Sequence, residues 1–472
     1  MRTVLAFDFG ASTGRAILGS FDGEKITYQE LHRFENVPTD ENGHLCWNYP
    51  ALLREVENTI ANCGKVDAIA FDTWGVDYGI ITKDGSLSGL PVNYRDARTN
   101  GMPEKLSETL PFEVLYQATG NQIMAINTLF QLMTDQDKRD NAKMLLFMPD
   151  LFAWSLCGAE TVERTIASTS QMVDPLTGQW DHRITALTGF PESFFPKIVD
   201  SATRCGDYKG IPIIKAAGHD TQCAIAAMPC IDDTQAAFLS CGTWSLIGCE
   251  LEEPILTEKS MQDALSNEIG ANGKINYLKN ISGLWLIQEI RRNFRAEGRE
   301  YSYNDMEQLA RKEPAFTCFI DPDAPEFASG GGMPEKIRNY CRRTDQKVPV
   351  NDGALVRCIY ESLAMKYRYA IEQIQENTGK TFEVLHLLGG GTKDEFLCQM
   401  VADSLQILVI AGPIEATAVG NILLQLIALG EIESVSAGRE LIRRHEKVTT
   451  YLPRQASGFP EAYESYCNLI CK

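Results

Sequence analysis

The segment Val4–Ser20, VLAFDFGASTGRAILGS, is the feature that most constrains the fold of this chain. Apolar residues lead to Asp8, small residues from Gly10 to Gly14 follow, and a second apolar run leaves them, which is the pattern of strand, tight turn and strand. A turn of small residues lets backbone N–H groups converge on an anion without obstruction by side chains. The segment therefore predicts a β-hairpin that can bind phosphate.

The turn of this hairpin supplies candidate ligands for phosphate and metal. Backbone N–H groups and two hydroxyl groups would donate to phosphate oxygens, and an arginine adds a fixed positive charge. The candidates are Ala11, Ser12, Thr13, Gly14 and Arg15. Asp8, at the end of the first strand, would hold a hydrated Mg²⁺ ion, which prefers one or two carboxylates with water and phosphate oxygens. Hairpins of this composition also occur in proteins that bind no ligand.

A second hairpin of the same design follows about half a chain later, in Ala236–Glu250, AAFLSCGTWSLIGCE, with Thr243 in its turn. Two such hairpins indicate a duplicated domain in which each copy presents one hairpin to a shared cleft. A chain of 472 residues also exceeds the size that one core usually serves. We therefore expect two α/β domains, residues 1–235 and 236–472.

The composition excludes several classes of function. The net charge of −19 disfavours non-specific binding to nucleic acid and to anionic membranes. The 14 cysteines are scattered without a C-x-x-C pair, which favours a reduced, cytoplasmic protein. No apolar run approaches the length of a transmembrane helix. We expect small-molecule ligands, and a monomer or a homodimer is left open.

Two further segments carry candidate ligand groups. Asp72–Asp77, DTWGVD, follows an apolar strand and lies at the strand end where an open sheet places ligand groups, although either aspartate could simply cap a turn. Glu163–Met172, ERTIASTSQM, is dense in hydroxyl groups. That run suits a sugar, which needs many neutral donors and acceptors, and equally suits a surface loop.

The segment Ile211–Pro229 places a carboxylate at the start of a helix. An apolar strand ends near Gly218, and His219, Asp220 and Thr221 open a helix rich in alanine. Asp220 is either an N-cap or a general base that takes a proton from a substrate hydroxyl, and the spacing supports both equally.

The segment Val384–Gly391, VLHLLGGG, joins a buried strand directly to three glycines. Glycine at the carboxyl end of a strand lets a ligand lie against the backbone. Because a β-α-β-α run continues through Leu408–Ala411, a pocket for a nucleotide base or ribose is favoured over pure packing.

Together these segments resemble the FGGY carbohydrate kinases, a family of the actin-like ATPase superfamily. The resemblance rests on six motifs in order: DFGASTGR at Asp8–Arg15, DTWGVD at Asp72–Asp77, AGHDT at Ala217–Thr221, GTWSLIG at Gly242–Gly248, LKNISGLWLIQ at Leu278–Gln288 and AGPIEATAVGN at Ala411–Asn421. Each motif alone is weak, but six in order over nearly the whole chain are specific. Within the family the set is most similar to the members that phosphorylate L-rhamnulose.

The resemblance implies two RNase H-like α/β domains with ATP and sugar in an inter-domain cleft. It also implies transfer of the γ-phosphoryl group of ATP to the primary hydroxyl of L-rhamnulose, with Asp220 as the base. The sugar contacts implied are Gly75, His219, Asp220, Thr221 and Asn280. The implied ATP contacts are Ala11–Arg15, Thr243, Gln288 and Gly390, with Asp8 positioning Mg²⁺ and Trp74 covering a face of the sugar.

One departure and two alternatives qualify this interpretation. Many family members have Asn two residues after the three glycines, where this chain has Lys393 and Asp394. An ionised Asp accepts hydrogen bonds but does not donate them, so contacts to base or ribose there are in doubt. The alternatives are a kinase of the same fold for L-fuculose, L-ribulose or D-xylulose, and a non-catalytic sensor of ATP and sugar.

Overall fold

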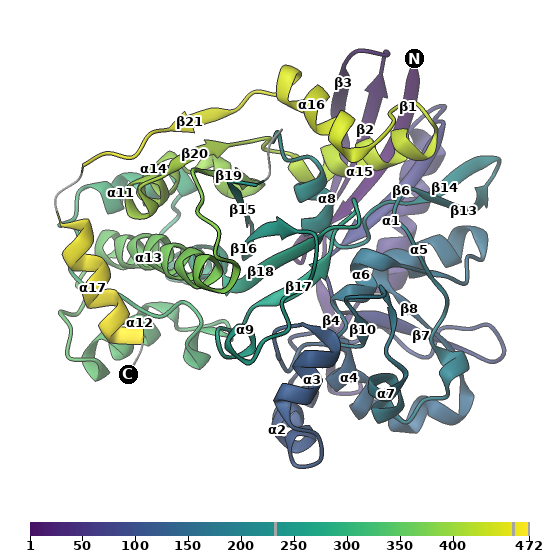
Figure 1. Cartoon of the computed structure of the whole chain (residues 1–472), viewed down its shortest axis with the longest axis horizontal. Helices are drawn as coiled ribbons and strands as arrows, with labels where there is room; N and C mark the ends of the chain where they lie inside the picture. Colours follow the sequence, from purple (N-terminus) through teal and green to yellow (C-terminus); the bar gives the residue numbers. More distant parts are fainter. Residues whose placement is uncertain (231–233, 456–457, 471–472) are drawn as a thin grey trace. The chain divides into compact units, whose positions relative to one another are not determined.

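The computed structural model describes residues 1–230, 234–455 and 458–470 (Figure 1). The chain forms two compact units, neither of which is a single continuous segment. The first contains Met1–Ile231, Glu250–Tyr277 and Glu415–Glu446, and the second contains Asp232–Cys249, Leu278–Ile414 and Lys447–Lys472. The domain boundary between residues 235 and 236 stays a prediction. None of the described helices is long and apolar enough to cross a membrane.

The first unit combines one large sheet with surrounding helices and short strand pairs. Its strands are β1 Arg2–Phe9, β2 Thr13–Phe21, β3 Ile26–Glu35, β4 Pro38–Glu41, β5 His44–Trp47, β6 Ala68–Thr73, β7 Tyr78–Thr82, β8 Ala142–Phe147, β9 Val162–Glu163, β10 Val173–Asp174, β11 Gln179–Trp180, β12 Ile198–Val199, β13 Thr203–Tyr208, β14 Ile211–Lys215 and β17 Ser266–Ile269. Its helices are α1 Tyr49–Asn62, α2 Met102–Ser107, α3 Phe112–Thr119, α4 Thr128–Thr134, α5 Met148–Cys157, α6 Arg164–Ser168, α7 His182–Thr185, α8 Asp220–Ala226, α9 Glu258–Gln262, α15 Ala416–Ala428 and α16 Val435–His445.

The second unit is built in the same manner. Its strands are β15 Ala236–Cys241, most of β16 Trp244–Leu251 and of β18 Ile275–Ser282, β19 Val384–Leu388, β20 Leu408–Ala411 and β21 Thr449–Tyr451. Its helices are α10 Trp285–Ala296, α11 Tyr303–Arg311, α12 Met333–Arg343, α13 Asp352–Thr378, α14 Glu395–Leu405 and α17 Phe459–Ile470, with a 3₁₀ turn, η6, at Gly390–Lys393.

The two large sheets share one pattern of strand pairing. The first has the order β13-β14-β6-β1-β2-β3, in which β1 pairs antiparallel with β2 and parallel with β6. The second has the order β17-β18-β16-β15-β19-β20-β21, in which β15 pairs antiparallel with β16 and parallel with β19. Both predicted hairpins are therefore confirmed. The strands of each hairpin lie in the interior of their sheet.

Helices α8 and α15 pack closely in the first unit and carry part of its core (Figure 1). Their approach requires glycine, because a Cβ atom on Gly420 would lie 1.8 Å from the carbonyl oxygen of Cys223. Both helices begin at candidate site segments, so this packing holds the N-termini of α8 and α15 in fixed positions.

The polar run from Glu163 to Met172 is not a surface loop. It forms the end of β9 and helix α6, and nearly all of its residues are buried. The surface-loop alternative is wrong because Glu163 and the hydroxyl groups of the run satisfy buried backbone donors, as described below.

Candidate active site

The first hairpin brings Asp8 and Arg15 side by side. They are directly paired in the register of β1 and β2. The Arg15 guanidinium forms ion pairs with Asp8 and with Glu415, which precedes α15. Burial alone would lower the pKa of Arg15, but the two carboxylates outweigh it and raise the pKa. Arg15 is therefore a permanent cation that neutralises part of the charge of Asp8.

Asn36 supports the turn of the first hairpin, which is the candidate phosphate site. Its backbone N–H donates to the carbonyl oxygen of Ser12 (3.0 Å), and its side-chain amide donates to the carbonyl oxygen of Gly10 (3.1 Å). Two acceptors of the turn are thereby occupied, which favours the approach of an anion to its N–H groups. Reasoning from the sequence missed Asn36 because it follows β3, outside any motif.

Asp8 and Asp72 are paired in the parallel register of β1 and β6, and Asp220 lies near enough for the charges of the three carboxylates to interact. Burial and the charge of Asp8 hold the pKa of Asp72 well above its ordinary range. Burial also raises the pKa of Asp220 to about 6, and Asp8 contributes to that rise. Unfavourable interactions between carboxylates are the condition that a divalent cation relieves, so these residues fit Mg²⁺.

Asp72 is the most deeply buried of these three carboxylates, with an exposed fraction of 0%. Its Oδ2 accepts a hydrogen bond from the Asn421 amide at 2.6 Å. Its Oδ1 has no hydrogen-bond partner among the described residues. The free oxygen is an unused acceptor, which suits a water molecule of a hydrated cation.

Asp220 opens α8, as predicted, but His219 occupies the N-cap position, so the N-cap alternative for Asp220 is wrong. The Asp220 side chain is 30% exposed. Its Oδ1 accepts a hydrogen bond from the backbone N–H of Thr221 (2.6 Å) and lies 3.5 Å from His219 Nε2. A carboxylate that reaches solvent, with a pKa near 6, can accept a proton at neutral pH.

His219 is oriented by a carboxylate that the sequence did not indicate. Glu268, on β17, accepts from His219 Nδ1 (3.0 Å) and from the side-chain amide of Gln222 (2.8 Å). Burial would lower the pKa of His219, but Glu268 and then Asp220 raise it overall. The result is a chain of interactions from Glu268 through His219 to Asp220.

The loop that contains Gly75 rests on the buried polar run. The Val76 amide donates to Thr169 Oγ1 (3.1 Å), and a Cβ atom on Gly75 would lie 3.3 Å from the Thr169 side chain. Glu163 accepts from the Gly218 amide at 2.8 Å. The polar run therefore positions the loops that carry the candidate sugar contacts.

Asp77 and Trp74 have a structural role in the described contacts. Asp77 Oδ2 accepts from the indole N–H groups of Trp47 (2.6 Å) and Trp74 (2.9 Å). Trp74 is only 6% exposed and its ring lies 4.0 Å from that of Trp47. The indole of Trp74 thus packs in the core, where it leaves little surface for a sugar.

The second hairpin brings Thr243 and Gln288 together in the second unit. Thr243 Oγ1 donates to the Gln288 side-chain carbonyl at 3.3 Å. The amide of Trp285, the first residue of α10, donates to the carbonyl oxygen of Thr243 at 3.0 Å.

Asn280 is half-buried on β18 of the same unit. Gly75, His219, Asp220 and Thr221 belong to the first unit.

The three glycines after β19 are not equivalent. Gly389 has a φ of +81°, and a Cβ atom on Gly391 would lie 2.3 Å from Cys241 Sγ. A Cβ atom on Gly390 would meet no described atom within 4 Å. Backbone conformation and packing account for Gly389 and Gly391, whereas Gly390 presents an open face to which a ligand has access.

Asp394, the departure from the family pattern, caps a helix. Its carboxylate accepts from the Leu397 amide at 2.9 Å, at the N-terminus of α14. Capping is a complete structural explanation for an aspartate at this position.

Comparison with known families and proteins gives matches over the whole chain. The N-terminal domain of the FGGY family of carbohydrate kinases matches residues 3–240, and its C-terminal domain matches residues 237–429. A rhamnulokinase from Bacteroides thetaiotaomicron is 37% identical over 98% of this chain and 99% of its own length. A rhamnulokinase from Enterococcus faecalis is 38% identical over 94% of this chain and 92% of its own length. A rhamnulokinase from Halalkalibacterium halodurans is 37% identical over 96% of this chain and 99% of its own length.

Solved structures agree on the fold. A ligand-bound xylulose kinase from Lactobacillus acidophilus superposes with a TM-score of 0.77 at 16% identity, covering 100% of this chain and 96% of that one. A Plasmodium falciparum glycerol kinase with ADP superposes with a TM-score of 0.76 at 16% identity, covering 100% of this chain and 98% of that one. The chain therefore has the two-domain, RNase H-like fold of these kinases.

Proposed function

Because this chain belongs to the FGGY family of carbohydrate kinases, we propose that it transfers the γ-phosphoryl group of ATP to the 1-hydroxyl of L-rhamnulose, giving L-rhamnulose 1-phosphate and ADP. The observation that carries the choice of sugar is the full-length similarity to three rhamnulokinases. We assign the protein to L-rhamnose catabolism in the cytoplasm, as a monomer or homodimer.

Asp220 is the proposed base. The proton of the sugar 1-hydroxyl passes to an Asp220 carboxylate oxygen, the hydroxyl oxygen forms a bond to the γ-phosphorus, and the bond from that phosphorus to the β-phosphate oxygen breaks to release ADP. Its half-buried carboxylate, with a pKa near 6, supports this role. His219 orients the carboxylate and is itself oriented by Glu268.

The proposed phosphate site is the first hairpin. The turn residues, Ala11, Ser12, Thr13 and Gly14, donate N–H and hydroxyl groups to phosphate oxygens, and Arg15 supplies positive charge. Asp8 is the proposed ligand for Mg²⁺, and Asp72 would accept a hydrogen bond from a water molecule of the hydrated ion. When bound, Mg²⁺ neutralises charge on the transferring phosphate. The unpartnered Oδ1 of Asp72 supports this assignment.

The remaining contacts are assigned to sugar and nucleotide. Gly75, Thr221 and Asn280 are proposed to bind the sugar together with His219. Thr243, Gln288 and Gly390 are proposed to bind ATP, and the open face of Gly390 supports this for the glycine loop. Binding of the two substrates positions the hydroxyl for in-line attack, which is the main contribution that a phosphoryl-transfer enzyme makes.

The test is an ADP-release assay with Mg-ATP and a panel of L-rhamnulose, L-fuculose, L-ribulose, D-xylulose and glycerol. We expect clear preference for L-rhamnulose. Preference for another sugar would keep the kinase mechanism and reject the substrate, and ATP binding without turnover on any sugar would favour a sensor.

The Asp220→Asn variant tests the base. Its turnover is expected to fall by about 10²–10⁴-fold with sugar affinity nearly unchanged. Asp207→Asn is the matched control, because Asp207 is an exposed aspartate of the same unit that pairs with Arg204. Near-normal turnover in Asp220→Asn would remove Asp220 from the mechanism.

A further inference from the structure

Three cysteine side chains of the second unit lie close together, and none of them belongs to the candidate active site. Cys318, Cys341 and Cys358 place their Sγ atoms within 4.8 Å of one another. All three side chains are buried, with exposed fractions of 4%, 0% and 2%. Among the residues that the structure describes, this is the one group of three His, Cys, Asp or Glu side chains with such spacing.

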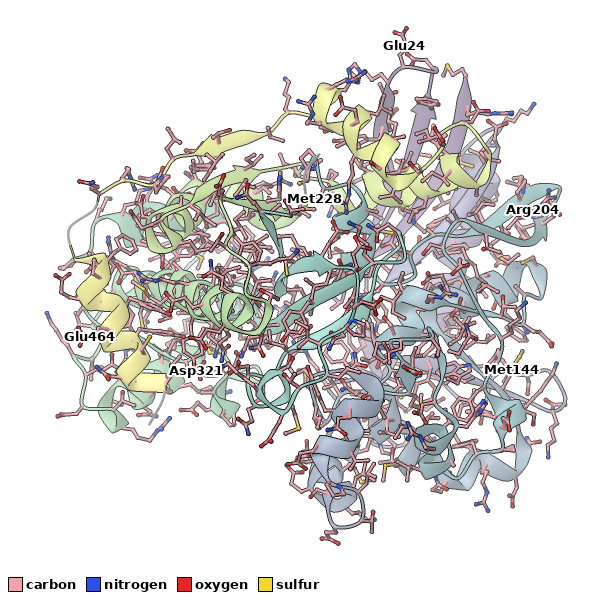
Figure 2. The ribbon with its side chains drawn as sticks, viewed as in Figure 1. Glu24, Met144, Arg204, Met228, Asp321 and Glu464 are labelled. Carbon is pink, nitrogen blue, oxygen red and sulfur yellow. The ribbon has the colours of Figure 1, made fainter. Side chains whose placement is uncertain are left out.

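The three sulfur atoms come from three separate segments. Cys318 follows α11, Cys341 lies in the last turn of α12, and Cys358 lies on the buried face of α13. Asp321, labelled in Figure 2, is three residues beyond Cys318 and locates this region. Tertiary packing, and not a local C-x-x-C pattern, therefore brings the sulfurs together, so no sequence motif indicates this cluster.

Hydrogen bonds between the three segments hold the backbone around each cysteine in place. The amides two residues before and after Cys318 donate to Glu361 (2.8 Å) and to Ser362 Oγ (2.9 Å), both on α13. Ser362 Oγ in turn donates to the carbonyl oxygen of Cys358 at 2.6 Å. Cys318 and Cys358 are thus held in one framework.

Gln346 extends that framework to the third cysteine. Its amide N–H donates to the carbonyl oxygen of Cys341 at 2.9 Å. Its side chain both accepts from and donates to the backbone of Phe319, at 2.8 Å in each case. Supporting contacts of this kind orient ligands in metal sites, and here they fix the backbone on both sides of the cluster.

We propose that Cys318, Cys341 and Cys358 form a trithiolate site for one soft d¹⁰ cation, zinc(II) or copper(I). Thiolates select these ions over magnesium and calcium. Three sulfurs bound to one ion at about 2.3 Å lie roughly 4 Å apart, which agrees with the spacing. On binding, each thiol loses its proton and each sulfur donates an electron pair to the ion, without any change of oxidation state.

A site of this kind joins α12 and α13 to the segment after α11, so its role is structural. A disulfide is the competing arrangement, but it requires a sulfur pair at about 2.05 Å and leaves the third cysteine without a partner. Simple packing of three thiols as small apolar groups is the other competitor.

The experiment measures ion content and ion uptake of the full-length, reduced protein. Zinc and copper are quantified by mass spectrometry after purification, and the demetallated protein is titrated with Zn²⁺ or Cu⁺ against a chromophoric chelator. We expect about one ion per chain, either zinc or copper. The separate titrations with Zn²⁺ and with Cu⁺ identify which of the two ions binds. Cys341→Ala and Cys358→Ala should each lose uptake by at least tenfold, whereas Cys46→Ala, which removes a buried thiol of the first unit, should retain it.

Three outcomes would overturn the proposal. If the wild-type protein binds no more metal ion than folded Cys341→Ala does, the three sulfurs pack simply as thiols. Two fewer free thiols per denatured chain than the sequence holds would mean a disulfide. Because an alanine variant can fail to fold, Co²⁺ and Cu⁺ are also added separately to the demetallated wild-type protein. Absence of both a sulfur-to-cobalt charge-transfer band and the ultraviolet absorption of copper(I)-thiolate would reject the site without any variant.

Discussion

Asn421 donates a 2.6 Å hydrogen bond to Asp72, although 349 residues separate the two in sequence. Gln425 donates to the Asn421 side-chain oxygen (2.8 Å) and to the carbonyl oxygen of Leu5 (3.2 Å), so α15 is tied to both central strands β1 and β6. This chain of amides holds a buried carboxylate in place beside Asp8, at a position where burial and the charge of Asp8 oppose its ionisation.

Asp72→Asn is predicted to stabilise the free protein while it lowers activity. The pKa of Asp72 is raised in the folded state, so between about pH 4 and that raised value the folded protein binds more protons than the unfolded chain. Stability is therefore lost as the pH rises through this window. Asparagine does not ionise, so the variant should exceed the wild type in free energy of unfolding at pH 8, and the difference should shrink at pH 5. Urea denaturation at pH 5 and pH 8 measures this difference.

Asn421→Ala is predicted to have the opposite effect on stability. It removes the side-chain donor to a buried carboxylate, at a cost of about 1–3 kcal/mol. In the Asp72→Asn background the loss should shrink, because a neutral amide tolerates a missing donor better than a carboxylate does. Equal losses in both backgrounds would mean that the hydrogen bond does not couple the two residues.

The activity is predicted to depend on the ionisation of Asp220. Its pKa is raised to about 6, and only the ionised carboxylate can accept the sugar proton. The value of kcat/KM, which reports the free enzyme, should fall about tenfold per pH unit below pH 6 and level off above it. Initial rates at subsaturating sugar between pH 4.5 and 8.5 provide the measurement. A profile that is flat from pH 5 to 8 would contradict the assignment of Asp220 as the base.

Local patterns predicted the parts of the site that are contiguous in sequence. Both hairpins followed from apolar runs around small turn residues, and the position of Asp220 at a helix start followed from the change of pattern after Gly218. Asp72 was predicted at the end of a strand, where it could also cap a turn. Its pairing with Asp8 was not predicted, because the parallel register of β1 and β6 could not be read from the sequence.

The positioning residues were not predictable, because they act across long separations. Glu268 reaches His219 from β17, and Asn421 reaches Asp72 from α15. No periodicity of the sequence connects such pairs, since their contact depends on how helices pack on the sheet. The two alternatives for the run from Glu163 to Met172 could not be separated for the same reason. Its polar composition is also typical of a surface loop, and only the folded structure shows the buried backbone amides that it binds.

Glu268→Gln is predicted to shift the pH profile without removing activity. The charge of Glu268 raises the pKa of His219 against the effect of burial, and charged His219 lowers the pKa of Asp220. Glutamine keeps an acceptor for His219 but removes the charge. His219 then loses its proton at lower pH, the pKa of Asp220 rises, and the acidic limb of kcat/KM should move up by about one pH unit.

The exposed Glu24, at the tip of a hairpin in Figure 2, provides the control for that shift. Glu24→Gln changes the net charge equally and should leave the profile in place. A Glu268→Gln variant with a lower kcat but an unmoved limb would indicate that Glu268 supports the fold and does not act through His219.

Gly390→Ala and Gly391→Ala are predicted to separate ligand binding from packing in the glycine loop. A methyl group on Gly391 collides with Cys241 Sγ, so that variant should lose about 1–3 kcal/mol of stability. A methyl group on Gly390 meets no described atom within 4 Å, so stability should change by less than about 0.5 kcal/mol. If ATP lies against the open face of Gly390, the KM for ATP of that variant should rise about tenfold with KM for sugar unchanged. Urea midpoints and the two KM values measure these effects, and an unchanged KM for ATP in Gly390→Ala would place the nucleotide elsewhere.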